Sequence, residues 1–213
     1  RIIFDGIKAV GVEYKILGKR FLVYAKKEII LSAGAIQSPQ ILQLSGIGKA
    51  ADLRKIDVPV ITDLPGVGEN LQDHVNAPLL YKTNLSFTAN KLYHDPFRKI
   101  KEGLKYAFFR RGMLAMGACY AGGYLTVQPD SANPDIQALL LLFSTEDLGG
   151  VPHKFDGITI NVALMRPESR GFVKAKNADI SEAPIIQPNY LEAKKDRDTL
   201  VAGMQEIRKI MRK

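Results

Sequence analysis

The chain has 213 residues, of which 46% are hydrophobic and 24% are charged, a balance typical of a globular protein with a sizeable core. Its net charge of +8 comes from lysines and arginines spread along the chain, which favours solvated surface positions over a patch for anionic partners. The single cysteine, Cys119, excludes a disulfide within these residues, and the longest apolar run, residues 136–143, is too short to span a bilayer.

The N-terminal residues are predicted to form a β-meander. Residues 2–4 and 9–14 are apolar stretches on either side of an Asp5-Gly6 turn, which is a strong hairpin signal. A second turn, around Gly18, leads into a third strand at residues 21–25.

A corner built from small residues follows the meander. Residues 28–33 predict an apolar strand, and residues 33–35 predict a turn without bulky side chains. Ser38 is then the candidate N-cap, and Pro39 the first residue, of a helix that ends at Leu44. A second short helix is expected at residues 49–55.

The chemistry of this corner suits a bound cofactor. Backbone N–H groups at Ala33, Gly34 and Ala35 can approach a ligand closely because no large side chain intervenes. The N-terminus of the helix that follows carries partial positive charge, which favours phosphate. Ser38 is a further candidate for cofactor contact, although starting the helix is its main expected role. The alternative is tight packing of strand against helix without any ligand.

The rest of the chain predicts an antiparallel sheet with helices on one side, because its strands mostly lack the alternation with helices that a parallel sheet needs. The predicted strands cover residues 79–83, 122–127, 135–143, 158–165 and 172–175. Two longer segments, residues 95–111 and 196–213, have apolar residues at helical spacing. In the last helix the expected inner face consists of Leu200, Met204, Ile207 and either Ile210 or Met211.

Three separated stretches resemble one enzyme family. Ser-Ala-Gly-Ala-x-x-Ser-Pro-x-x-Leu-x-x-Ser-Gly-Ile-Gly, at residues 32–48, is similar to the second signature of the glucose–methanol–choline (GMC) oxidoreductases. Leu-Pro-Gly-Val-Gly-Glu-Asn-Leu-Gln-Asp-His follows at residues 64–74. Residues 166–173 and 184–191 complete the resemblance, in the order that the family has them.

This resemblance implies a fold of the α+β or α/β class, with part of an FAD-binding domain and an antiparallel-sheet substrate domain flanked by helices. The FAD-binding part is expected at residues 1–74, the substrate-binding part at 75–191, and a helix returning toward the FAD domain at 192–213. Family members are much longer. We therefore expect a middle segment, with the FAD diphosphate loop before it and the active-site histidine after it.

The resemblance also implies an activity for the whole protein. The family oxidises the CH–OH group of an alcohol by hydride transfer to FAD, while a histidine takes the hydroxyl proton. The partners implied are FAD and a small alcohol, and no nucleic acid is expected. No catalytic residue and no metal ligand is expected within this chain, and the chain alone should be inactive. The electron acceptor stays unassigned, and the compartment is expected to be the cytoplasm or a membrane surface.

The second motif offers further candidates. Gly66-Val67-Gly68 is not a dinucleotide-binding loop, since the third glycine position holds Leu71. Asn70 and Asp73 are candidate cofactor-binding residues, although satisfying backbone groups in the loop is their main expected role. His74 belongs to the same loop and is not expected to act as the catalytic base.

Three other positions carry more specific expectations. Choline-oxidising relatives place a glutamate two residues after the Asp-His pair, where this chain has Asn76, so a neutral alcohol is favoured over choline. Arg170 is expected to act as a structural clamp that holds a carboxylate or backbone carbonyls, and Tyr190 to be packed rather than catalytic. Two alternatives remain open, namely a GMC-like chain with a structural role and a basic module that binds an anionic surface or nucleic acid.

Overall fold

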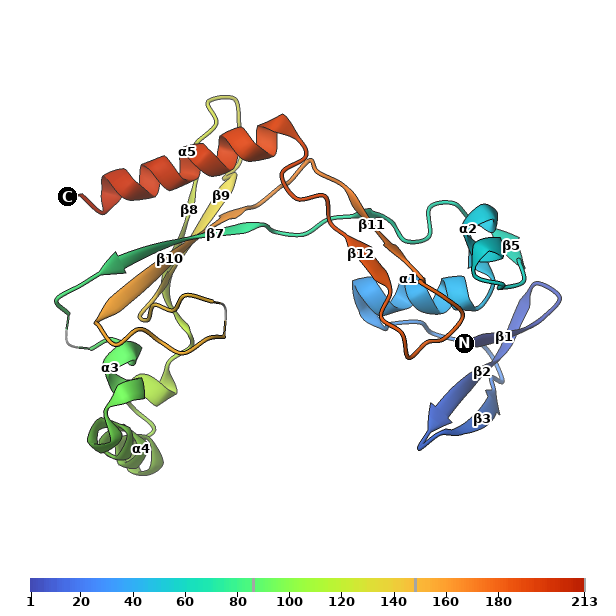
Figure 1. Ribbon diagram of the computed structural model, residues 1–213, viewed down its shortest axis with the longest axis horizontal. Helices are drawn as coiled ribbons and strands as arrows, with labels where there is room; N and C mark the ends of the chain where they lie inside the picture. Colours follow the sequence, from blue (N-terminus) through green and yellow to red (C-terminus); the bar gives the residue numbers. More distant parts are fainter. Residues whose placement is uncertain (86, 148, 213) are drawn as a thin grey trace. The chain divides into compact units, whose positions relative to one another are not determined.

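The computed structural model describes residues 1–85, 87–147 and 149–212. The chain forms two compact units (Figure 1). Unit 1 consists of Arg1–Asp73 and Ser169–Tyr190, and unit 2 of His74–Glu168 and Leu191–Lys213. Lys213, where the last predicted helix should end, lies outside the described residues.

Unit 1 begins with the predicted β-meander. Strands β1 (Ile2–Asp5), β2 (Lys8–Ile16) and β3 (Lys19–Tyr24) pair antiparallel in sequence order. Gly6 and Gly18 sit in the two turns with positive φ angles of 56° and 82°, which glycine adopts at little cost. Local turn chemistry was sufficient to predict this element.

The remainder of unit 1 combines short helices with two small sheets. Its elements are α1 (Gly34–Leu44), β4 (Ile47–Gly48), α2 (Ala50–Lys55), β5 (Thr62–Asp63), β6 (Glu69–Leu71), β11 (Gly171–Lys174) and β12 (Ile185–Gln187). Strands β4 and β5 pair in parallel, whereas β11 pairs antiparallel with both β12 and β6. The buried core of this part of unit 1 consists of Leu44, Leu53 and Val58.

The region around α1 departs from the prediction in two ways. Residues 28–33 form no strand, because no segment among the described residues provides the backbone partner that a strand requires. The helix begins at Gly34, one turn earlier than predicted, so Ser38 is not its N-cap and Pro39 lies inside it. The Ser38 hydroxyl instead accepts a hydrogen bond from the N–H of Ala33 at 3.1 Å.

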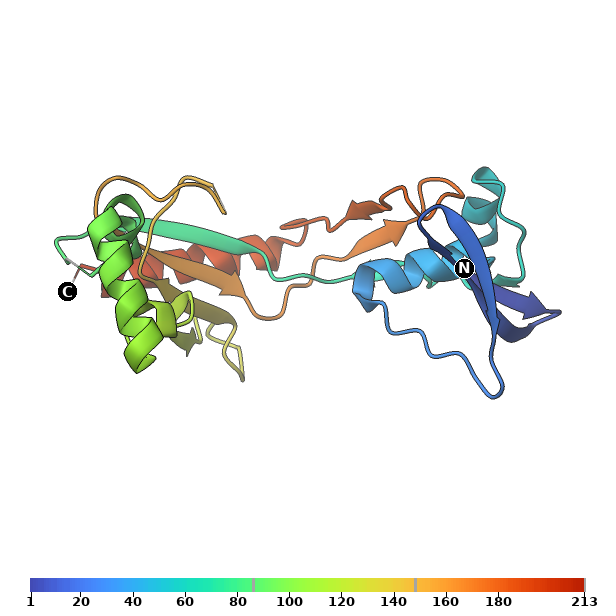
Figure 2. The same ribbon diagram turned by 90° about the horizontal axis from the view of Figure 1, so that it is seen from below.

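Unit 2 contains the predicted antiparallel sheet, and one long helix packs against it. The strand order is β7 (Asn76–Lys82), β10 (Gly157–Leu164), β9 (Ile136–Leu141) and β8 (Cys119–Leu125). Helix α5 (Lys194–Ile210) runs along one face of this sheet (Figures 1 and 2). The buried core between them consists of Leu79, Ile136, Ile160, Val162, Leu164, Leu200 and Ile207.

The inner face of α5 is shorter than predicted. Leu200 and Ile207 are buried and Met204 packs against the core, but Ile210 and Met211 are exposed. Gly203 allows the close approach of the helix, since a Cβ there would lie 2.9 Å from the Ile136 side chain.

Two shorter helices and a 3₁₀ turn connect β7 to β8. These are α3 (Ala89–His94), α4 (Pro96–Phe109) and η1 (Met113–Ala115). Asp95 caps α4 by accepting from the N–H groups of Phe97 and Arg98. The amide of Asn90, on α3, is fully buried and bonds the backbone of Ser144 and His153. Helix α3 is thereby fixed to the loop after β9.

The units divide the chain differently from the boundaries expected from sequence. Residues 169–190 group with the N-terminal residues instead of the substrate-binding part. The last helix packs on the sheet of unit 2 and belongs to that unit. The fold class is that expected, a mixed α/β fold with antiparallel sheets and helices.

Candidate functional site

The corner at the start of α1 is open. Ala33, Gly34 and Ala35 are all exposed, and a Cβ added at Gly34 would meet no atom within 4 Å. Gly34 has a φ of 84°, and no side chain caps the first turn of α1. The N–H of Ala33 is already bonded to the Ser38 hydroxyl, whereas the N–H groups of Gly34 and Ala35 are presented to a ligand without a competing side chain.

The other end of α1 is anchored by two buried glutamines. Gln43 donates from Nε2 to the carbonyls of Val67 and Val173, at 3.2 and 3.0 Å, and its Oε1 accepts from the N–H of Ala175. Gln40 donates to the carbonyl of Glu182 at 2.8 Å. The sequence analysis missed both residues. The available signal was a pair of polar residues, three apart, among the apolar residues Ile41, Leu42 and Leu44 of the second half of the helix.

The glycines of the second motif serve packing. Gly68 has a φ of 86°, and a Cβ there would collide with the carbonyl oxygen of Val173. The N–H of Val173 donates to the carbonyl of Gly68 at 2.6 Å. This close backbone contact explains the glycine and agrees with rejecting Gly66-Val67-Gly68 as a dinucleotide-binding loop.

Asn70 occupies a bulge in β6. Leu71 and Glu69 pair with the adjacent residues Gly171 and Phe172, which leaves Asn70 as the extra residue between them. Its φ of 59° is one that asparagine tolerates better than most residues. The bulge exposes the Asn70 side chain, and its contact with a cofactor stays a prediction.

Asp73 and Tyr190 form a pair across unit 1. The Tyr190 hydroxyl donates to a carboxylate oxygen of Asp73. This hydrogen bond, followed by burial and the negative charge of the carboxylate, raises the pKa of Tyr190 above its ordinary value. Tyr190 is 47% exposed, so the prediction of a packed tyrosine was wrong. A bond between side chains 117 residues apart cannot be read from local pattern. Cofactor contact by Asp73 stays a prediction.

Arg170 and Asn189 tie the two ends of the 169–190 segment together. Arg170 donates from Nη1 to the carbonyl of the neighbouring Ser169 at 3.0 Å, which is a backbone contact of the kind expected. Asn189 donates from Nδ2 to the carbonyl of Arg170 at 2.9 Å. The segment thus forms a closed loop within unit 1.

In unit 2, the sheet face opposite α5 carries a polar row. Strand register places Tyr124, Gln137, Ala163 and Asn76 side by side across β8, β9, β10 and β7. Gln137 donates from Nε2 to the Tyr124 hydroxyl at 3.1 Å. The four strands contain no Asp or Glu. This face offers hydrogen-bonding groups and an aromatic ring, but no negative charge.

The chain matches two models of one family. A model described as GMC oxidoreductase matches residues 1–76, and a second with the same description matches residues 167–213. Human mitochondrial choline dehydrogenase is 41% identical over 196 residues, which cover 92% of this chain and 33% of that protein. The oxygen-dependent choline dehydrogenase of Burkholderia cenocepacia is 36% identical over 215 residues, covering 100% of this chain and 37% of that protein. The chain thus spans about a third of these relatives.

Solved structures share the fold. A formate oxidase superposes with a TM-score of 0.85 at 23% identity, covering 96% of this chain and 41% of the oxidase. An FAD-dependent oxidoreductase from Chaetomium thermophilum gives a TM-score of 0.82 at 23% identity, covering 98% of this chain and 42% of that protein. The two family models together match more than half of the chain, and the chain belongs to the GMC oxidoreductase family.

Proposed function

We propose that this chain is the middle part of an FAD-dependent oxidoreductase that oxidises the CH–OH group of an alcohol. FAD is the cofactor of the whole protein, and when bound it accepts the hydride from the alcohol carbon. The observation that carries the proposal is the open corner at Gly34, together with the family of the chain.

Each residue of the corner has a defined task in this proposal. Gly34 and Ala35 present backbone N–H groups to the adenosine half of FAD, and Ala33 lines the corner with a side chain small enough to let the nucleotide approach. Gln43 holds α1 against the backbone of residues 173–175, which fixes the direction of the helix N-terminus. The Ser38 hydroxyl accepts a hydrogen bond from the N–H of Ala33, which holds the backbone of the corner in place.

The experiment replaces Gly34 in the full-length protein that contains this chain. Gly34→Ala places a methyl group where the nucleotide should lie and should weaken FAD binding about tenfold, the equivalent of roughly 1.4 kcal/mol. Gly6→Ala is the matched control, because Gly6 also has positive φ and open space around it. FAD affinity is measured by flavin absorbance after dialysis. Equal FAD affinity in the two variants would contradict the placement of FAD at this corner.

The substrate we propose is a neutral alcohol. The sheet face opposite α5 carries no carboxylate, and Asn76 at its edge supplies an amide in place of a negative charge. A buried quaternary ammonium needs an opposite charge or an aromatic cage to offset the loss of water. Choline is the second candidate, supported by the names of the 41% and 36% identical relatives and by the exposed rings of Tyr120 and Tyr124.

A pair of isosteric substrates separates these candidates. Choline and 3,3-dimethyl-1-butanol have the same shape and differ in charge, so the ratio of their kcat/KM values reports charge recognition. We expect the neutral alcohol to be preferred, and Asn76→Glu to shift the ratio about tenfold toward choline. Asn177→Asp, an exposed position in unit 1, controls for the change in net charge. A wild-type preference for choline would establish the second candidate.

A further inference from the structure

Helix α4 turns its apolar side outward. Phe97, Ile100, Leu104 and Phe108 follow one another at intervals of three and four residues, so they form one stripe along the helix. Their exposed fractions are 84%, 62%, 53% and 76%, and α4 has no buried residue. We call these four residues the α4 stripe.

The polar side of α4 faces the rest of unit 2 instead. Arg98, Lys101, Glu102 and Lys105 line a pocket together with Met113 and Leu142. Glu102 accepts from the N–H of Met113 at 3.0 Å, which ties the polar side of α4 to η1. The outward direction of the stripe is therefore fixed by specific contacts of the opposite side.

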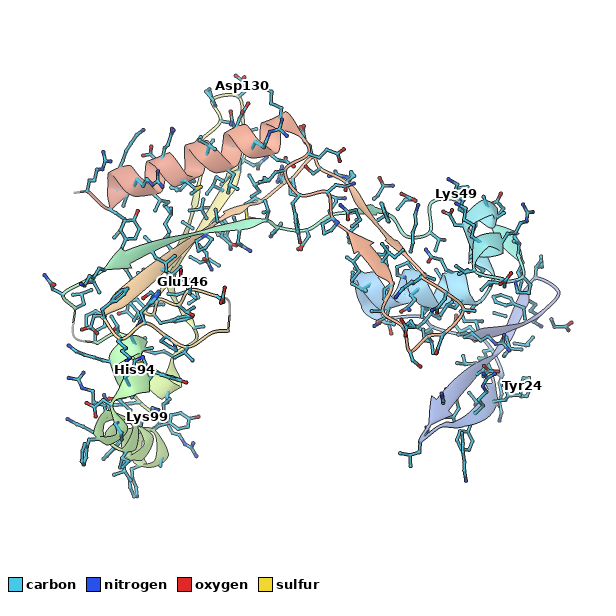
Figure 3. All side chains as sticks on the ribbon, viewed as in Figure 1. Tyr24, Lys49, His94, Lys99, Asp130 and Glu146 are labelled. Carbon is cyan, nitrogen blue, oxygen red and sulfur yellow. The ribbon has the colours of Figure 1, made fainter. Side chains whose placement is uncertain are left out.

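Helix α4 and the two residues that follow it are strongly positive. Residues 96–111 contain six basic side chains and one acidic one, Glu102, which gives six minus one, or +5. The basic residues are Arg98, Lys99, Lys101, Lys105, Arg110 and Arg111. Lys99 projects from α4 (Figure 3) and lies 4.7 Å from the centre of the Tyr93 ring. Within the part of the chain that is described, Lys99, Lys101, Arg110 and Arg111 make no ion pair.

We propose that α4 docks unit 2 onto an anionic lipid surface. Helices that lie in the membrane interface combine an apolar stripe rich in Phe and Leu with Lys and Arg beside it. A lipid surface supplies both acyl chains for the α4 stripe and phosphates for Lys99, Arg110 and Arg111, the basic residues that lie outside the pocket. A protein partner fits less well, because protein interfaces are depleted in lysine and α4 contains three within residues 96–109.

Vesicle sedimentation of the full-length protein tests the stripe. The probes are vesicles of phosphatidylcholine alone and of phosphatidylcholine mixed with phosphatidylglycerol. The wild-type protein should sediment with the mixed vesicles, and Phe97→Ser/Phe108→Ser should weaken this partitioning more than about tenfold. Val151→Ser/Val201→Ser removes two exposed apolar side chains elsewhere in unit 2, with exposed fractions of 64% and 52%, and should leave binding unchanged.

A second pair of variants tests the charge. Arg110→Glu/Arg111→Glu, at two exposed positions outside the pocket, should weaken binding to mixed vesicles by roughly fivefold for each positive charge lost near the surface. Lys26→Glu/Lys27→Glu makes the same change in net charge at exposed positions of unit 1 and should have a much smaller effect. Binding by the wild-type protein should also fall as salt is added.

Three results would overturn the proposal. The first is equal binding to neutral and mixed vesicles, and the second is unchanged binding by Phe97→Ser/Phe108→Ser. The third is that the wild-type protein binds no vesicles but self-associates, and that Phe97→Ser/Phe108→Ser loses this self-association, measured by light scattering. The stripe would then contact a second copy of the protein. FAD content should be the same in all variants, which separates this test from that of the proposed function.

Discussion

Gln43 shows how a single buried side chain can hold together segments that are distant in sequence. Only 6% of it is exposed, and it bonds three backbone groups from residues 67, 173 and 175. A buried backbone group left without its partner costs far more than the hydrogen bond contributes on its own. Gln43 is therefore the residue on which the attachment of β11 to α1 depends most directly.

Removing this amide should destabilise unit 1. Gln43→Leu keeps a similar volume but leaves the three backbone groups unsatisfied, so we expect the free energy of unfolding to fall by about 3 kcal/mol. Urea unfolding of the full-length protein measures the change. Gln37→Leu, at an exposed position on the same helix, should change it by less than about 0.5 kcal/mol. Similar values for the two variants would show that Gln43 has no special role.

The Asp73–Tyr190 pair predicts a pH dependence. The folded state raises the pKa of Tyr190 above its ordinary value of 10.0, first through the hydrogen bond to Asp73. Stability from this pair is therefore fully present below pH 10 and is lost as pH rises through the higher folded pKa. Phenolate absorbance, compared with that of Tyr190→Phe, isolates the titration of Tyr190. In Asp73→Asn that titration should move down toward pH 10, and an unmoved curve would contradict the pairing.

At the scale of elements, α4 and α5 carry the same kind of pattern and use it in opposite ways. Both have apolar residues at helical spacing, in α4 at Phe97, Ile100, Leu104 and Phe108. Helix α5 buries Leu200 and Ile207 against the sheet of unit 2, whereas the α4 stripe is exposed. Periodicity predicts that a helix has an apolar side, but the partner of that side depends on where the helix lies.

Truncation of Leu200 tests how α5 holds unit 2. Leu200 is 7% exposed within the core, so Leu200→Ala should lower the free energy of unfolding by about 2–5 kcal/mol. Val201→Ala, one residue further along α5 but 52% exposed, should cost less than about 0.5 kcal/mol. Thermal unfolding of the full-length variants compares the two, and equal costs would show that α5 does not dock through this side.

At the scale of the whole molecule, the chain spans about a third of the length of its relatives. None of the described helices has the length and hydrophobicity required to cross a membrane. We propose that residues 1–213 expressed alone neither retain FAD nor oxidise alcohols, because the diphosphate loop and the active-site histidine implied by the family are expected elsewhere in the protein. Flavin absorbance and a dye-coupled alcohol assay test this, and yellow, active protein would contradict it.

The α1 region marks the boundary between what sequence patterns could and could not predict. The motif identified the corner at Gly34, and the structure shows that corner to be open. The strand before it and the cap at Ser38 were predicted wrongly, because both depend on partners that local propensity does not specify. The same holds for Tyr190, whose partner Asp73 is 117 residues away.

The sequence by itself determined the family, the fold class and most of the helices and strands, since signature residues, turn chemistry and periodicity are local properties of the chain. Only the tertiary structure decided that residues 169–190 join unit 1, that Gln43 holds them there, and that α4 turns its apolar stripe outward. The physical reason is that these features depend on contacts between residues far apart in the sequence, and long-range packing selects among the arrangements that local patterns allow.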